Sequence, residues 1–400
     1  MNHSRRRVLL TGAAATVTAS AGCTSLLDGE NGGTADDGNG GEGDSDEDET
    51  SAGEDDPEIA AGDWPSFQRT AANDGYTPST APTAEPSERW STTLSGSISE
   101  QVAVVDGTVY VATDAGTVHA LDAADGDERW SESLEGGRSQ SPCVVDGLIV
   151  VGTEEDELVA LDAADGEREW TTELAGPVAG PTAADGTVYV GTSDEPVAYA
   201  IDAADGDEQW SAELSLDAVD YPAVADDAVY VGVEEGLDGR LHALDRIDGS
   251  EAWLHEGARM QSPTLVKDDI VAPSLTVELL TPDGVSHGGF GFAGHVIWSP
   301  AATSKAVFAG STGGRFAAFE RADTGTDWNV EVGRRPISAP AVTDDAVYLT
   351  AGEPKLVALA VGTGDRLWAR SLEGEFATGP AVADEAVFVG TDEGRLVAFE

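Results

Sequence analysis

Tryptophan recurs along this 400-residue chain at a fixed interval, and that period restricts the possible folds more than any other feature. The residues that follow it are Trp90, Trp130, Trp170, Trp210, Trp253, Trp328 and Trp368. Most of these intervals are 40 residues long, and one is 43. A repeat of this length is typical of structural units that are stacked in a row or arranged in a ring.

Each repeat contains four short segments with the composition of strands. Residues 141–145 alternate apolar side chains after a Ser-Pro pair, and residues 188–192 and 158–162 are rich in β-branched and aliphatic residues. A run that contains the tryptophan completes the unit, and turn residues separate the segments. Four short antiparallel strands in every unit predict the blades of an all-β propeller.

An acidic residue precedes the tryptophan by eight positions in five units. These residues are Asp122, Asp162, Asp202, Asp245 and Glu320. A glycine such as Gly126 lies between the two, where it can adopt a positive φ angle at little cost. We expect the acid to accept hydrogen bonds from turn amides. The tryptophan ring, which buries about 150–250 Å², should then fill the space between neighbouring blades.

The repeats add up to eight blades. The sets of three inner strands begin near Gln101, Ser141, Gly180, Tyr221, Ser262, Ser299, Ala339 and Gly379. The last set ends at Glu400 without an outer strand, whereas residues 88–94 form an outer strand that precedes the first set. We predict that these two parts pair, because closure removes a sheet edge that would otherwise favour aggregation.

The motif that runs from Ala120 through Asp122 and Gly126 to Trp130 resembles the tryptophan-docking motif of pyrroloquinoline-quinone (PQQ)-like propellers. The resemblance covers residues 64–400, and residues 63–69 resemble the segment that precedes the first blade in that family. It implies eight blades, as in the quinoprotein dehydrogenases and in the propeller lipoprotein of the barrel-assembly machinery.

The first 63 residues have a different character. Residues 4–10 place twin arginines before an apolar run and resemble a Tat export signal. Residues 20–23 resemble a lipobox that would make Cys23 a lipidated first residue. We therefore expect a signal peptide at 1–22, the lipidation cysteine with a disordered acidic linker at 23–63, and the propeller at 64–400. The expected location is the extracytoplasmic face of the cytoplasmic membrane, with the lipid as the sole membrane contact.

The charge of the chain excludes nucleic acid as a partner. Asp and Glu total 75 against 21 Lys and Arg, which gives a formal net charge of −54. Phosphate backbones would be repelled by this field. The same composition is typical of halophilic proteins, in which high salt screens self-repulsion, and it resembles that of haloarchaeal proteins. With only Cys23 and Cys143, the chain has neither a disulfide scaffold nor a thiolate zinc cluster.

The resemblance also allows a test for enzymatic chemistry. Quinoprotein dehydrogenases carry adjacent cysteines, a Ca²⁺ ion and a catalytic Asp, but Cys143 stands alone at a position that other units fill with alanine. We predict a buried packing role for Cys143, no catalytic residue and no metal site. PQQ and Ca²⁺ remain possible cofactors, with Glu100 and Asp220 as potential Ca²⁺ ligands.

The histidines are interpreted by their place in the repeat. His119 and His242 replace bulky strand residues and are predicted to be packing residues. His287 and His295 flank a glycine-rich stretch in the fifth unit, which has no docking tryptophan and carries Glu278 where we align alanine in the others. Two interpretations remain open for this unit, sequence drift or a specialised ligand site.

One set of positions should surround the mouth of the central channel. Each lies two residues before the proline, or the residue aligned with it, at which the innermost strand of a blade begins. They are Glu100, Gln140, Ala179, Asp220, Gln261, Trp298, Ser338 and Thr378. Nearby loops carry four of the scarce basic residues, Arg138, Arg259, Arg334 and Arg335. These arginines indicate either an anionic ligand or partner, or a balance of local acids.

These observations favour a monomeric, non-enzymatic propeller that binds protein or peptide partners at the cell surface. Binding could use strand addition or contacts of the mouth residues. The alternative is a PQQ- or Ca²⁺-dependent dehydrogenase without the cysteine pair. A ligand-sensing propeller is a third possibility.

Overall fold

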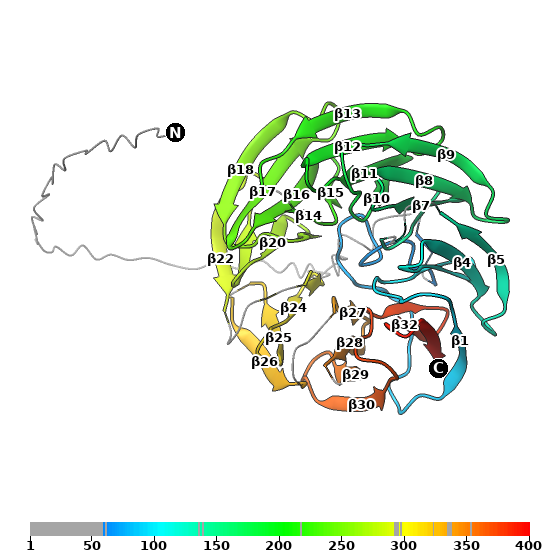
Figure 1. Cartoon of the computed structure of the whole chain (residues 1–400). Helices are drawn as coiled ribbons and strands as arrows, with labels where there is room; N and C mark the ends of the chain where they lie inside the picture. Colours follow the sequence, from blue (N-terminus) through cyan, green and yellow to red (C-terminus); the bar gives the residue numbers. More distant parts are fainter. Residues whose placement is uncertain are drawn as a thin grey trace, which may run out of the picture. The chain divides into compact units, whose positions relative to one another are not determined.

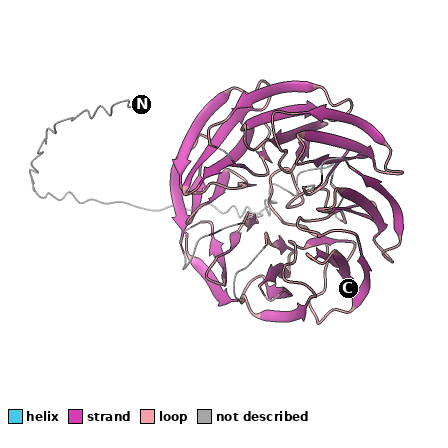
Figure 2. Ribbon diagram, viewed as in Figure 1, coloured by secondary structure: helices cyan, strands magenta, loops and turns pink. Residues whose placement is uncertain are grey.

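The computed structural model describes residues 59–400, apart from residues 61, 135–136, 138–139, 217, 292–295, 297, 323, 334–337 and 353. The predictions for the signal peptide, Cys23, most of the linker, Arg138, His295, Arg334 and Arg335 therefore lie outside the described residues. The described residues form strands and turns without helices, so none of them provides a helix able to cross a membrane (Figure 2).

Eight antiparallel sheets surround a common axis, which confirms the predicted eight-bladed propeller (Figure 1). Blades 1 to 3 comprise β2 (Ala103–Val105), β3 (Thr108–Ala112), β4 (Thr117–Asp122) and β5 (Glu128–Ser133); β6 (Cys143–Val145), β7 (Leu148–Gly152), β8 (Glu157–Asp162) and β9 (Arg168–Glu173); and β10 (Thr182–Ala184), β11 (Thr187–Gly191), β12 (Val197–Asp202) and β13 (Glu208–Glu213). Blade 4 comprises β14 (Ala218–Val219), β15 (Ala223–Val224), β16 (Ala228–Glu235), β17 (Asp238–Asp245) and β18 (Glu251–Gly257).

The remaining blades follow the same order from the axis outward. Blades 5 and 6 comprise β19 (Thr264–Val266), β20 (Asp269–Pro273), β21 (Val277–Leu280) and β22 (Ser286–Phe290); and β23 (Ala301–Ala302), β24 (Ala306–Gly310), β25 (Arg315–Glu320) and β26 (Thr326–Glu331). Blades 7 and 8 comprise β27 (Ala341–Val342), β28 (Ala346–Ala351), β29 (Lys355–Ala360) and β30 (Arg366–Ser371); and β31 (Ala381–Ala383), β32 (Ala386–Gly390), β33 (Arg395–Phe399) and β1 (Glu88–Thr93).

The ring closes within blade 8, as predicted. Strand β1 pairs antiparallel with β33, placing Trp90 opposite Ala398 and Thr93 opposite Arg395. Backbone bonds between Ser87 and Glu400 extend the pairing by one residue in each strand. The first and last strands of the propeller therefore share one sheet, and β33 is not left as a free edge.

The docking tryptophans join a blade to the next one at every junction except that between blades 5 and 6. The Trp90 Nε1 donates to the Ala123 carbonyl at 2.9 Å, and its ring lies over Gly126. Six equivalent bonds start from Trp130, Trp170, Trp210, Trp253, Trp328 and Trp368. The turn acids also act as expected, since Asp122 Oδ1 accepts from the Ala124 amide at 2.9 Å. These contacts confirm the interpretation of the repeated motif.

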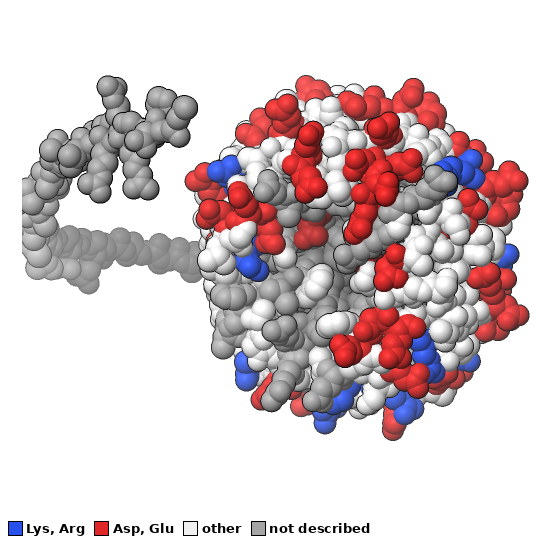
Figure 3. All heavy atoms as spheres, in the orientation of Figure 1, with Lys and Arg blue, Asp and Glu red and all other residues white. Residues whose placement is uncertain are grey.

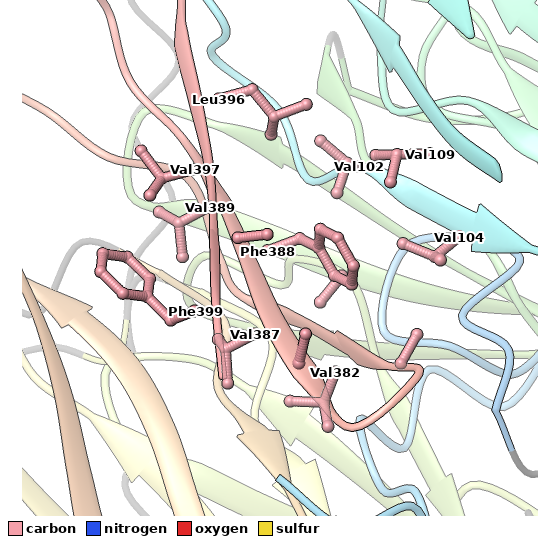
Figure 4. Close-up of a cluster of buried hydrophobic side chains, with 14 of the residues drawn as sticks. Val102, Val104, Val109, Val382, Val387, Phe388, Val389, Leu396, Val397 and Phe399 are labelled. Atoms are coloured by element: carbon pink, nitrogen blue, oxygen red, sulfur yellow. The ribbon is translucent and has the colours of Figure 1, made fainter. Parts of the chain in front are cut away.

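The apolar core lies between blades rather than inside any one of them. In the largest cluster, Phe388 of blade 8 points toward Val104 and Val109 of blade 1, whereas Val389 lies on the other face of the same strand (Figure 4). Trp64 joins the same cluster from the segment that precedes the first blade, and its side chain is completely buried. Each blade therefore depends on its neighbours for the burial of its apolar faces.

The fifth blade corrects one alignment made from the sequence. Strand pairing places Leu279, and not Glu278, at the position that alanine fills in other blades, with Gly288 opposite it where the tryptophan would stand. Two other contacts fill this junction with blade 6. Phe290 stacks on Phe319 with ring centroids 4.6 Å apart. Asp269 of blade 5 pairs with Arg321 of blade 6 at 2.6 Å. Within blade 5, the same carboxyl group also pairs with His287 at 2.9 Å.

Candidate ligand site at the channel mouth

A segment without regular secondary structure fills the centre of the ring, and we call residues 64–77 the plug (Figure 1). Its backbone bonds to the innermost strands of successive blades. The Val144 amide donates to the Pro65 carbonyl, the Val224 amide to Ala71, and later amides to Ala72, Asp74 and Gly75. The free edges of the innermost strands are thus partly satisfied from within the channel.

Two amide side chains fix the plug to blades 4 and 6. Gln68 Nε2 donates to the Pro300 carbonyl at 3.1 Å, and Asn73 Nδ2 donates to the Pro222 carbonyl at 3.0 Å. Both plug residues have a φ of 54°, a conformation that asparagine tolerates better than most residues. The carbonyl groups of the prolines that precede the innermost strands therefore accept hydrogen bonds from the plug.

Tyr221 connects the plug to the far side of the mouth. Its ring stacks on Phe67 with centroids 4.0 Å apart and an angle of 13°. Its hydroxyl donates to Glu100 Oε2 at 3.1 Å and accepts from the Ser141 amide at 3.3 Å. Burial and the Glu100 carboxyl raise the pKa of Tyr221 well above its ordinary value, so the hydroxyl keeps its proton and holds Glu100 in one orientation.

The mouth contains a pocket of about 290 Å³ above Phe67. It brings together four of the predicted mouth residues: Glu100, Trp298, Ser338 and Thr378. Phe376 and Asp392 also line it, and the sequence analysis did not identify either residue. The side chains of Trp298 and Phe376 are 44% and 54% exposed, although most large aromatic residues of this chain are buried.

The family model described as outer membrane protein assembly factor BamB matches residues 83–178, 170–299 and 284–400. The chain belongs to this family. No curated protein matches the sequence.

Solved structures share the fold of this BamB-family chain at low sequence identity. BamB from Moraxella catarrhalis superimposes with a TM-score of 0.67 and 21% identity over 79% of this chain and 98% of that one. The quinohemoprotein alcohol dehydrogenase from Comamonas testosteroni gives 0.72 and 15%, over 84% and 80%. A europium-containing methanol dehydrogenase gives 0.70 and 14%, over 85% and 98%. At these identities the likeness shows the fold alone.

The mouth residues of this BamB-family chain do not fit a catalytic metal. Among the described residues, no three His, Cys, Asp or Glu side chains converge closely enough to hold an ion. Glu100 and Asp220, the predicted candidates for Ca²⁺, lie near the same tyrosine without such a third partner. Burial raises the pKa of the Cys143 thiol to about 12, which suits packing and not reactivity.

A second polar group lies in blades 4 and 5, and none of its residues lines the pocket. It consists of Asp220, Glu234, Arg259 and Gln261, three of which were predicted as mouth residues. Glu234 Oε2, Arg259 Nε and Gln261 Oε1 are buried and make no hydrogen bond. Such atoms are rare in native structures, because each carries a desolvation cost without compensation. Arg259 also has a φ of 53°, which is unusual for a residue with a long side chain.

The remaining mouth positions enter the inner strands without lining the pocket. The backbone amides of Gln140 and Ala179 donate to the carbonyls of Gly152 and Gly191.

Acidic side chains cover much of the face in Figure 3, on which Lys and Arg are sparse. A larger cavity of about 970 Å³ lies at the opposite end of the innermost strands. Acids such as Asp146 line this cavity. The φ of 49° at Asp146 suits the hairpin turn in which it lies, so its presence there is explained by the fold.

Asp220 should make the stability of the fold depend on pH. Burial, together with repulsion from Glu234, raises the pKa of Asp220 from 3.8 to about 6. The folded state therefore binds this proton more tightly than the unfolded state, and stability is lost as pH rises from about 4 through about 6. We expect Asp220→Asn to stabilise the protein at pH 7 by at most about 3 kcal/mol and to have little effect at pH 4.

Denaturant unfolding between pH 4 and pH 8 tests this prediction. The exposed Asp226→Asn, in the same blade, removes an equal charge and serves as the control. If the free energy of unfolding changed with pH in the same way for the Asp220→Asn variant and the unaltered chain, ionised Asp220 would not destabilise the fold.

Proposed function

We propose that this chain is an exported, lipid-anchored scaffold protein that binds a protein partner at the channel mouth without catalysing a reaction. Membership in the BamB family supports a binding role for the propeller. The proposed anchor is Cys23, after a Tat-type signal at residues 1–22 and before an acidic linker that ends at residue 63. The composition supports a halophilic host, and the export signal with Cys23 supports a location at the extracytoplasmic face of the cytoplasmic membrane, where the propeller would act as a monomer.

The observation that carries this proposal is the pair of exposed aromatic side chains at the pocket. Trp298 and Phe376 leave apolar surface in water beside a pocket floored by Phe67. Exposed aromatic residues around a recess are typical of protein interfaces, in which they become the main buried contacts. Because the plug fills the channel behind Phe67, a partner would bind across the mouth instead of entering the channel.

Site-specific cross-linking tests the proposed surface. A photoreactive phenylalanine analogue at Phe376 should form a covalent adduct with one defined membrane or surface protein in intact cells. The same analogue at Ile247, which is 89% exposed on an outer turn of blade 4, serves as the control. Adducts at Ile247 but not at Phe376 would place the interface elsewhere on the propeller. The absence of any adduct at both positions would argue against a scaffold role.

A further inference from the structure

We propose that the mouth pocket recognises a positively charged side chain, arginine or lysine, that the protein partner presents. This inference rests on the proposed function and specifies the chemistry of the partner. Three features of the described residues carry it: the sign of the charges around the pocket, its aromatic walls, and the fixed position of one carboxyl group.

The charges around the pocket favour a cation. Glu100 and Asp392 line it, and none of the described lining residues is basic. Beyond the lining, Asp220 lies near Tyr221 and Glu234 lies near Asp220, with a single arginine, Arg259, in the same group. Opposite charge across an interface increases the association rate and selects the partner.

The aromatic walls suit the same ligand. Phe67, Trp298 and Phe376 all line the pocket. The face of an aromatic ring attracts ammonium and guanidinium groups, with tryptophan the strongest of the three, and it also accepts the apolar part of a long side chain. An aromatic pocket with acidic groups is therefore matched to a cation carried on an aliphatic chain.

Glu100 is positioned for this role before any ligand binds. The Tyr221 hydroxyl donates to its Oε2, and the Tyr221 ring is held in turn by Phe67. Gly180 leaves room for that ring, since any side chain at this position would overlap it. A carboxyl group fixed by such contacts loses less freedom when it pairs with a guanidinium.

The size of the pocket limits the ligand to one side chain. A volume of about 290 Å³ is at the lower end of the range of roughly 300–1,000 Å³ for small-molecule sites. A bare metal ion does not fit, because the described acidic groups do not converge on one point. The anionic ligand that Arg138, Arg334 and Arg335 suggested from the sequence predicts the opposite charge, so one experiment decides between the two.

Calorimetric titration of the full chain with blocked pentapeptides, at one salt concentration, tests the inference. Gly-Gly-Arg-Gly-Gly should bind at least about tenfold more tightly than the same peptide with citrulline, which has the same shape without the charge. A peptide with glutamate should not bind. Tetramethylammonium should bind more weakly than the arginine peptide, because a free cation lacks the chain that contacts the aromatic walls.

Two variants locate the site. Glu100→Gln and Trp298→Ala should each weaken arginine-peptide binding by about tenfold or more. Glu256→Gln, at an exposed acid on the outer strand of blade 4, and Leu237→Ala, at an exposed apolar residue, should leave it unchanged. Because the Trp298 side chain is already exposed, Trp298→Ala keeps the test valid even if Glu100→Gln disturbs folding.

Several results would overturn the inference: equal binding of the citrulline peptide, tighter binding of the glutamate peptide, undetectable binding of the arginine peptide, or no effect of both mouth variants. Tetramethylammonium that binds as tightly as the arginine peptide would assign the pocket to a free cation instead. The proposed function would survive any of these results if the Phe376 cross-link to a partner persisted, and it would fail separately if that cross-link were lost.

Discussion

A chain shortened to begin at residue 95 should fail to form a stable propeller, whereas one that begins at residue 59 should match the full chain. The longer truncation removes β1, and with it the outer strand of blade 8 and the Trp90 contact with Gly126. Loss of a buried tryptophan contact alone costs about 3–5 kcal/mol. Because domains are stable by only about 5–15 kcal/mol in total, the further loss of strand pairing should exceed what remains.

An intermediate truncation separates closure from the plug. A chain that begins at residue 79 keeps β1 but has lost residues 64–77, so we expect it to remain folded with reduced stability. Circular dichroism and gel filtration distinguish these states, and the exposed edge of β33 should cause the shortest chain to associate. A folded monomer that begins at residue 95 would show that pairing of β1 with β33 does not hold the ring together.

Gly249→Ala should destabilise the protein far more than Gly236→Ala, although both glycines are in turns of blade 4. Their φ angles are similar, +71° and +68°, so each substitution carries a comparable backbone cost of about 1–2 kcal/mol. A methyl group at Gly249 would lie 2.6 Å from Trp210 Cε3, whereas one at Gly236 would meet nothing within 4 Å. We expect a further cost of about 1–3 kcal/mol from this overlap.

A double-mutant cycle assigns the extra cost to the tryptophan. In a Trp210→Ala background the overlap is absent, so the effect of Gly249→Ala should fall to that of Gly236→Ala. Chemical unfolding of the four chains measures these differences. Equal effects of the two glycine substitutions in the unaltered chain would mean that the blade junction relaxes around the added methyl group.

The architecture was largely predictable because every blade repeats the same local solution. A turn glycine at positive φ and a tryptophan eight residues after an acid recur often enough to reveal both the period and the position of closure. The fifth blade shows where this logic ends. This blade has no docking tryptophan to fix the alignment of its strands with those of the other blades. The sequence alignment therefore put Glu278 at the position of the repeated alanine, which the structure gives to the next residue, Leu279.

The ligand site was less predictable because it depends on contacts that follow no period. Spacing alone brought Glu100 and Trp298 to the mouth, but Phe376 comes from a loop and Phe67 from the plug. The sequence held one signal for Tyr221, because most other blades have serine, glycine or alanine at the equivalent position. A large ring at a position that is otherwise small has to extend away from its own strand. Its partners could be learned only from the structure.

The plug has a consequence for synthesis of the protein. Although residues 64–77 leave the ribosome before any blade, Gln68 bonds to carbonyls at Ser299 and Pro300, and the Gly75 carbonyl accepts from Val342. These partners exist only after more than two hundred further residues have been made. Since Phe67 floors the pocket, a nascent chain has no finished recognition surface, and a partner can engage only a propeller whose translation is essentially complete.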